Sequence, residues 1–114
     1  MEFAVFVYGD EEAEEALAPE DRRAIFEQHL ALGRLLEEAG VLRRSAGLAG
    51  SERSRVLRRR GGRVVTTDGP FAETKEQVGG FYVLECADEA DALRWAEQMP
   101  VGPGWAVELR PIVA

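Results

Sequence analysis

Cysteine and histidine are almost absent from this sequence, which holds one of each, Cys86 and His29, among its 114 residues. One cysteine cannot form a disulfide within the chain, and the pair cannot supply the four ligands of a zinc site. Nucleotide-binding glycine motifs are also missing, because "GGRVV" and "QVGGF" lack the required strand-loop-helix context. We therefore expect no metal and no cofactor, and we interpret Cys86 as a small buried apolar residue.

Long hydrophobic runs are missing too, since no stretch approaches the ~20 apolar residues that cross a bilayer. The start, "MEFAVFVYGD", has no basic region of the kind that opens a signal peptide. The net charge is −7, whereas a nucleic-acid partner requires a concentrated positive surface. These absences predict a cytoplasmic protein with no membrane partner, and they do not favour nucleic acid as a partner. The length of the chain fits one domain over residues 1–114.

The first half of the chain predicts a strand, a long helix and a second strand. Residues 3–8, "FAVFVY", are apolar and β-prone on both faces. An acidic loop at 10–16 precedes Pro19, which is typical of the first helical position. The helix should end near Gly40, and residues 41–48 form a weaker strand. The apolar stripe of the helix is expected to contain Ile25, Phe26, His29, Leu30, Gly33 and Leu36.

The second half predicts a hairpin, a strand, a helix and a closing strand. Gly61 and Gly62 suit a two-residue turn, which places Arg60 opposite Arg63 and Arg59 opposite Val64. Residues 79–87 form the next strand, and Asp88 caps a helix from Glu89 to about Gln98. This helix is expected to present Leu93, Ala96 and Met99 to the core, and residues 105–111 form the last strand.

This order of elements predicts an α+β protein with a ferredoxin-like split βαβ arrangement and an inserted hairpin. Two helices can cover only one face of such a sheet, yet the strands are apolar on both faces. Some of four bulky side chains should then need another cover: Phe6, Tyr8, Tyr82 and Leu84. We expect a homodimer to provide it, and the alternative is that residues 50–78 fold back over that face.

Several segments together resemble the DGPF branch of the YCII-related family: "FVYGDE", "FEQHLALGRLLEEAGVL", "TTDGPFAETKEQVGGFYVLE", "DEADALRWAEQMP" and "VELRP". The resemblance covers essentially the whole chain and implies a dimeric α+β barrel. It implies less about activity, because most of the family has no assigned reaction. Some members are dehydrochlorinase-like or carry a proposed His-Asp site, and many are encoded beside extracytoplasmic-function sigma factors. The segment "LAGSERSRVLR" departs from the family pattern, so the resemblance does not imply a ligand contact of the hairpin.

The DGPF loop holds most of the candidate site residues. Asp68 can accept backbone hydrogen bonds as a turn residue, or it can act as a general base or ligand anchor. Phe71 is expected to turn inward, while Glu73, Lys75 and Glu76 lie on a longer excursion. These three charges either form a solvated surface or let Lys75 hold an anionic group that a Glu orients.

His29 and Asp68 are the candidate catalytic or ligand pair that the resemblance implies. His29 is the one side chain whose ordinary pKa lies near neutrality, although a lone histidine on an apolar helix face can also be a core residue. Tyr8 could donate its hydroxyl into the same cleft. The ligand-binding candidates are thus Tyr8, Phe71, Glu73 and Lys75.

Three functions follow from this reading, and the sequence does not decide whether the protein is an enzyme. The first is a small dimeric protein that binds a small organic acid, lactone or halogenated ring and performs acid-base chemistry on it. The second is a non-catalytic accessory module of a sigma-factor system, in which the loop and the arginines of residues 53–63 contact protein. The third, which ranks last, is RNA or DNA binding through the hairpin.

Overall fold

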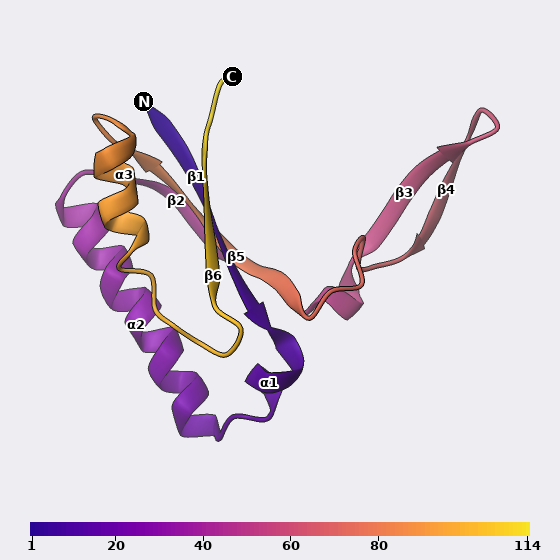
Figure 1. Ribbon diagram of the computed structural model, residues 1–114, viewed down its shortest axis with the longest axis horizontal. Helices are drawn as coiled ribbons and strands as arrows, with labels where there is room; N and C mark the ends of the chain where they lie inside the picture. The colour runs from indigo at the N-terminus through magenta and orange to yellow at the C-terminus, as the bar shows by residue number, and fades with distance from the viewer.

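The computed structural model describes all residues, 1–114, and is a mixed α+β structure with antiparallel sheets (Figure 1). Its elements follow one another in this order: β1 (Glu2–Asp10), α1 (Glu11–Glu15), α2 (Pro19–Glu38), β2 (Leu42–Gly47), the short 3-10 helix η1 (Ser51–Arg53), β3 (Arg55–Arg60), β4 (Arg63–Asp68), β5 (Glu76–Glu85), α3 (Glu89–Ala96) and β6 (Ala106–Pro111).

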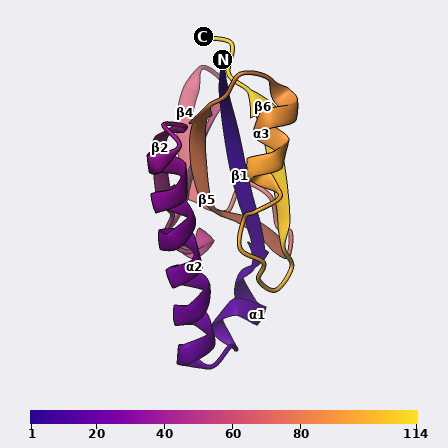
Figure 2. The same ribbon diagram turned by 90° about the vertical axis from the view of Figure 1, so that its left-hand side faces the viewer.

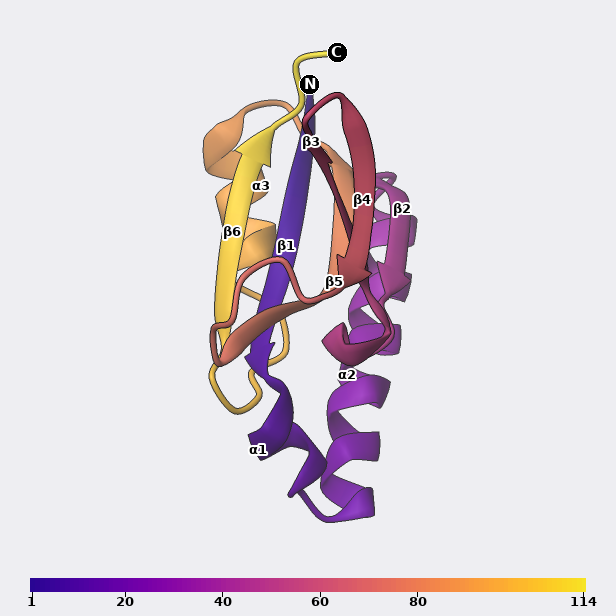
Figure 3. The same ribbon diagram turned by 90° about the vertical axis from the view of Figure 1, so that its right-hand side faces the viewer.

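Four of the strands form one antiparallel sheet in the order β2-β5-β1-β6. The central strand β1 places Val5 beside Tyr82 of β5 and beside Leu109 of β6, so these three residues share one face. Figure 2 shows α2 and α3 next to each other in front of this face. Figure 3 shows the opposite face, which no helix covers.

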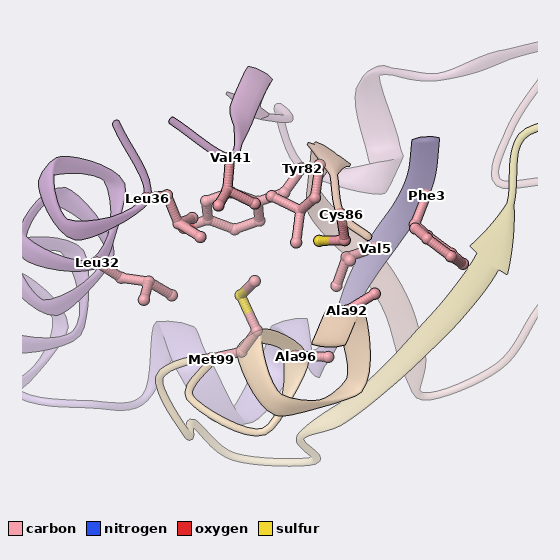
Figure 4. Packing of buried hydrophobic residues seen from close by; sticks show 11 residues of the cluster. Phe3, Val5, Leu32, Leu36, Val41, Tyr82, Cys86, Ala92, Ala96 and Met99 are labelled. Atoms are coloured by element: carbon pink, nitrogen blue, oxygen red, sulfur yellow. The ribbon is translucent and has the colours of Figure 1, made fainter. Parts of the chain in front are cut away.

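The hydrophobic core lies between helices α2 and α3 and the sheet. Leu36 of α2, Phe3 of β1 and Leu84 of β5 have no exposed surface, and each buried side chain of this kind stabilises the fold by roughly 1.5–3 kcal/mol. Cys86 is also buried, as the sequence predicted. Figure 4 shows side chains from both helices directed toward the strands. The full cluster is Phe3, Val5, Leu32, Leu36, Val41, Tyr82, Leu84, Cys86, Ala92, Ala96 and Met99.

Helix α2 begins at Pro19 and is followed by Gly40 with a φ of 71°, as predicted, but its buried face differs from the expected stripe. Phe26 is 61% exposed, and Leu30 is 47% exposed. Leu32, which the predicted stripe omitted, is only 5% exposed. The helix contacts the sheet tightly in its C-terminal half, whereas its N-terminal half lies beside a cavity.

Two smaller expectations about helices are corrected. Residues 11–15 form helix α1 rather than a loop, because the Asp10 carboxylate accepts a hydrogen bond from the Ala13 N–H and the acidic first turn suits the helix dipole. In α3, Leu93 is 44% exposed and Ala92 is buried in its place. The helix packs through its small residues, which allows a close approach to the sheet.

The face of the sheet opposite the helices holds only some of the side chains that were expected to need cover. Tyr82 and Leu84 are buried beneath the helices, so the prediction was wrong for these two residues. Phe6 lies beside Phe81 on the uncovered face, and both are half-buried. The apolar patch on this face is therefore smaller than the sequence indicated, and Phe81 belongs to it.

The hairpin β3-β4, residues 55–68, is called the arm below. Its turn has φ angles of 56° at Gly61 and 78° at Gly62, and its register pairs Arg60 with Arg63 and Arg59 with Val64, as predicted. It forms a separate two-stranded sheet. Figure 1 shows the arm projecting away from the four-stranded sheet, so residues 50–78 do not fold back over the uncovered face.

Candidate functional site

A cavity of about 490 Å³ lies between the N-terminal half of α2, helix α1 and the sheet. Its wall combines apolar side chains with a few polar groups, which is the usual composition of a small-molecule site. On the α2 side the wall consists of Arg22, Ile25, Phe26, His29 and Leu30. Three- and four-residue spacing puts these side chains on one helix face, which explains why Phe26 and Leu30 are not in the core.

The opposite wall is built largely from backbone, because it contains four glycines: Gly9, Gly47, Gly79 and Gly80. A Cβ atom at Gly80 would lie 2.9 Å from the Ala46 carbonyl oxygen, so strand β2 approaches too closely for a side chain. A Cβ atom at Gly47 would meet nothing within 4 Å. These glycines carry no side chains into the cavity, and sequence reasoning missed them although glycines inside strand patterns often mark a close approach.

His29 and Tyr82 form the main polar contact of the cavity. The His29 Nδ1 atom lies 2.6 Å from the Tyr82 hydroxyl, and the two rings stack with their centroids 6.0 Å apart and an interplanar angle of 21°. Tyr82 comes from the centre of β5, where pairing with Val5 turns it toward α2. The contact leaves Nε2 as the ring nitrogen of His29 that remains for another partner.

Burial shifts the acid-base behaviour of both residues in the direction of the neutral form. It lowers the pKa of His29 below its ordinary value, and it raises the pKa of Tyr82. At neutral pH the imidazole is therefore uncharged and the phenol keeps its proton. One of the two groups donates to the other, and a neutral imidazole can take either role.

The other end of the cavity is lined by Glu14 and Arg22. Burial raises the pKa of Glu14, with further contributions from the carboxylates of Glu11 and Asp10. A Cβ atom at Gly9 would collide with the Glu14 carboxylate, which therefore lies directly over the strand. Arg22 forms none of the four ion pairs of the chain.

Tyr8 also lines this cavity, but its hydroxyl donates to a side chain of strand β6. It donates to a carboxylate oxygen of Glu108 on β6 over 3.3 Å. Burial and, after it, the Glu108 carboxylate raise the pKa of this phenol. Tyr8 thus forms part of the cavity wall, while its hydroxyl is hydrogen-bonded to Glu108 on strand β6.

Asp68 does not line the cavity. It ends strand β4 with its side chain 86% exposed, and its carboxylate lies 3.6 Å from the guanidinium of Arg55. Gly69 beyond it donates its N–H to the Ser54 carbonyl oxygen over 2.9 Å, which closes the base of the arm. Within one chain the structure therefore does not bring His29 and Asp68 together.

The remaining loop candidates also lie away from the cavity. Phe71 is 75% exposed, so the expectation that it turns inward was wrong; its ring lies beneath the Arg58 guanidinium, 5.1 Å from centroid to carbon. Glu73 and Lys75 are exposed and belong to no ion pair. The side-chain amide of Gln77 holds this loop by donating to the Ala72 and Thr74 carbonyls, each over 2.9 Å.

Comparison with known proteins assigns the chain to a family. The model of the YCII-related domain matches residues 1–114, the full length described by the structure. The chain belongs to the YCII-related family. A relative in Rhizobium meliloti (strain 1021), the uncharacterized protein R00369, is 37% identical over 99 residues, which cover 87% of this chain and 80% of that protein.

Two further features of this YCII-related chain concern metal ions and membranes. No group of three or more His, Cys, Asp or Glu side chains is arranged to hold a metal ion. None of the helices combines the length and apolar character required to cross a membrane.

Proposed function

We propose that this YCII-related protein is a homodimer that binds a small, largely apolar molecule in the cavity beneath α2 and transfers a proton with His29. The observation that carries the proposal is the 2.6 Å contact between His29 and Tyr82 on the wall of a cavity of about 490 Å³. An imidazole of this kind is held in one orientation and kept neutral, which are the requirements of a general base.

The proton transfer uses both ring nitrogens. When the Nδ1–H of His29 donates to the Tyr82 oxygen, Nε2 carries a lone pair and can accept a proton from a carbon or oxygen acid in the cavity. The imidazolium that forms keeps its Nδ1–H bond to Tyr82 and can return the Nε2 proton to another atom of the same molecule. The pair thus supports an isomerisation or an elimination in which a proton leaves one atom and is delivered to another or to a leaving group.

The shape of the cavity favours a flat, uncharged ligand. The glycine wall offers backbone without side chains, and Phe26 and Leu30 face it from α2. The wall is largely apolar, and its one cation, Arg22, shares the other end of the cavity with the carboxyl group of Glu14. Of the ligand classes that the sequence suggested, a lactone or halogenated ring therefore fits better than an organic acid.

The dimer and its architecture belong to the same proposal. The strand order β2-β5-β1-β6 with α2 and α3 on one face is compatible with a ferredoxin-like arrangement that pairs its uncovered face in an α+β barrel. Asp68 of one subunit could reach only the His29 of a second subunit. A catalytic role for Asp68 therefore requires a dimer that brings these two residues together. A cytoplasmic location is also proposed and agrees with the free thiol of Cys86.

Coumarin, a flat and uncharged lactone, is a suitable probe of the cavity. We expect a fluorescence titration to show that Gly47→Val weakens coumarin binding at least about tenfold, because the new side chain enters the cavity at a position with free space. Gly33→Ala is the matched control, since Gly33 also has nothing within 4 Å of an added Cβ but does not line the cavity.

A carboxylated coumarin tests the preference for uncharged ligands in the same titration. We expect it to bind more weakly than coumarin at pH 7, because burying its carboxylate beside neutral His29 is unfavourable. Equal coumarin affinity in the wild type and in Gly47→Val would show that the cavity is not the binding site. His29→Gln should keep the cavity but abolish any proton exchange at carbon that deuterium incorporation detects in a bound ligand.

A further inference from the structure

A second cavity, of about 260 Å³, lies beside the one that contains His29. The two cavities share four lining residues, Gly9, Glu14, Arg22 and Gly79, and the place where they meet is called the junction below. Two of the four are glycines. Glu14 and Arg22 therefore supply the side chains of the junction, and each of them lines both cavities.

The junction lies where α1 and the first turns of α2 come together, and Figures 1 and 2 show these two segments at the same end of the molecule. A Cβ atom at Gly102 would lie 3.9 Å from a Glu14 carboxylate oxygen and 3.5 Å from the Ile25 Cδ1 atom. The carboxylate thus reaches the part of α2 that also carries Arg22, one turn before Ile25. Neither charged group takes part in any of the four ion pairs of the chain, so both remain for a ligand.

Two other polar side chains of the second cavity already have partners. The Glu11 carboxylate accepts hydrogen bonds from the Ser51 N–H over 2.7 Å and from the Ser51 hydroxyl. The Gln77 amide donates to two carbonyls of its own loop, as described above. Glu15 lines the second cavity alone. A ligand that extends from the first cavity into the second therefore meets the two side chains of the junction first.

The charges of the junction favour an uncharged group that both donates and accepts hydrogen bonds. Arg22 would attract an anion and Glu14 would repel it, whereas a cation would experience the reverse. Burial and, after it, the carboxylates of Glu11 and Asp10 raise the pKa of Glu14, and an N–H donor placed against this carboxylate would offset both effects. A primary carboxamide combines such a donor with a carbonyl oxygen that accepts from a guanidinium.

The spacing along α2 determines how long the ligand must be. Arg22 precedes His29 by seven residues, which corresponds to about two helical turns and about 10 Å along the axis. Residues at this spacing lie on the same helix face, and both line the first cavity. Ile25 and Phe26 form the wall between them. A molecule that contacts both residues has a polar group at each end and an apolar centre.

We propose that the ligand of this cavity is a flat ring whose reactive atom faces His29 and whose far end carries a carboxamide that Glu14 and Arg22 bind at the junction. This inference rests on the proposed function, because it takes His29 as the group that faces the ring. The carboxamide oxygen accepts from the Arg22 guanidinium, and its N–H groups donate to the Glu14 carboxylate. Glu14 and Arg22 thus determine which ligand binds and take no part in the proton transfer.

Three coumarins substituted at ring position 7 test the proposal in fluorescence titrations of the full chain. Each has its lactone at one end and a substituent of the same shape at the other. The carbamoylmethoxy group donates and accepts, the acetonyloxy group only accepts, and the methallyloxy group does neither. We expect the acetonyloxy compound to bind at least about fivefold more tightly than the methallyloxy compound, and the carbamoylmethoxy compound at least about fivefold more tightly again, because both hydrogen bonds involve a charged partner.

Substitution of each junction residue should remove one step of this series. Arg22→Met should abolish the advantage of the acetonyloxy over the methallyloxy compound, and Glu14→Met should abolish the additional advantage of the carbamoylmethoxy compound. The matched controls are Arg23→Met and Glu12→Met, which make the same changes at exposed positions of the same helices that line neither cavity. The affinities are compared as ratios within each variant, so a general effect on the fold does not imitate the result.

The other outcomes separate this inference from the proposed function. Equal affinities of the three compounds, with binding still weakened by Gly47→Val, would overturn the carboxamide and leave the cavity as the ligand site. An absence of binding by coumarin and by all three compounds would overturn both proposals. Tighter binding of 7-(2-aminoethoxy)coumarin than of the carbamoylmethoxy compound would also overturn this inference, because the carboxylates alone would then select the ligand.

Discussion

His29 is the residue on which the proposed chemistry depends, and its protonation can be measured directly. As the one histidine of the chain it gives a single set of imidazole resonances in proton NMR. Burial lowers its pKa, so we expect the resonance to titrate below about 6.5, the ordinary value for histidine. A midpoint above that value would contradict the neutral imidazole in the proposed mechanism.

The same shift predicts how stability depends on pH. With a pKa lower in the folded than in the unfolded chain, His29 binds its proton more readily after unfolding. Its contribution to the free energy of unfolding is therefore complete above about pH 6.5 and is lost as the pH falls from there toward the folded-state pKa. Urea unfolding followed by tryptophan fluorescence should show this loss in the wild type and a flatter profile in His29→Gln.

Tyr82→Phe tests the contact that orients the imidazole. The ring stays in the core, but Nδ1 of His29 loses its only hydrogen-bond partner within the chain. We expect a loss of about 1 kcal/mol in the free energy of unfolding, typical of one hydrogen bond. The His29 resonance should also shift at constant pH. An unchanged resonance would show that the two side chains do not interact in solution.

Of the contacting residues His29 and Tyr82, the sequence indicated a functional role for His29 only. His29 stood out because no other side chain titrates near neutrality. Tyr82 was recognised only as a bulky strand residue, because its approach to His29 depends on the register between β1 and β5 and on the position of α2 over the sheet. Asp68 and Phe71 were assigned to the site from a contiguous motif, yet Asp68 ends the arm, Phe71 follows it, and neither lines the cavity.

Helix α2 contains a glycine whose replacement should stabilise the helix. Gly33 lies in its interior with a helical backbone, and an added Cβ would meet nothing within 4 Å. Glycine inside a helix costs roughly 0.5–1 kcal/mol relative to alanine, so Gly33→Ala should raise the free energy of unfolding by about that amount. Thermal unfolding by circular dichroism measures the gain. A decrease would show that a second subunit approaches the helix at Gly33.

Helix α3 is short and depends on its N-terminal cap. The Asp88 carboxylate accepts a hydrogen bond from the Asp91 N–H over 2.8 Å. Asp88→Ala should lower the free energy of unfolding by about 1 kcal/mol, because the first turn loses this partner. Asp88→Asn is the control, since its amide oxygen can still accept and should recover most of the loss. Equal effects of the two substitutions would indicate a role for the charge instead.

The limits of helices and strands were more predictable than their buried faces. Pro19, Gly40 and the Gly61-Gly62 turn each favour one backbone geometry, and the structure confirms it at all three places. The buried face of α2 was misjudged because both Leu32 and Phe26 fit an apolar stripe by spacing. Which of the two is buried depends on where the sheet ends beneath the helix. The spacing of apolar residues along the helix does not contain that information.

At the scale of the molecule, the direction of the arm could not be predicted. The hairpin and its register follow from local pairing, but its angle to the sheet is set by the hydrogen bonds of Ser51, Ser54 and Gly69 at its root. The arm extends a structure that is otherwise one four-stranded sheet with three α-helices, and the molecule measures 48 × 40 × 17 Å. Such a shape leaves apolar and charged groups uncovered, which is the physical reason to expect a second copy.

A dimer makes the stability of this protein depend on its concentration. Because dissociation accompanies unfolding, raising the protein from about 1 to about 100 μM should increase the midpoint of thermal unfolding, whereas the midpoint of a monomer would stay constant. A midpoint that is independent of concentration in the wild type would mean that one chain alone forms the stable unit, and the exposed arginines of the arm would then need a partner other than this protein.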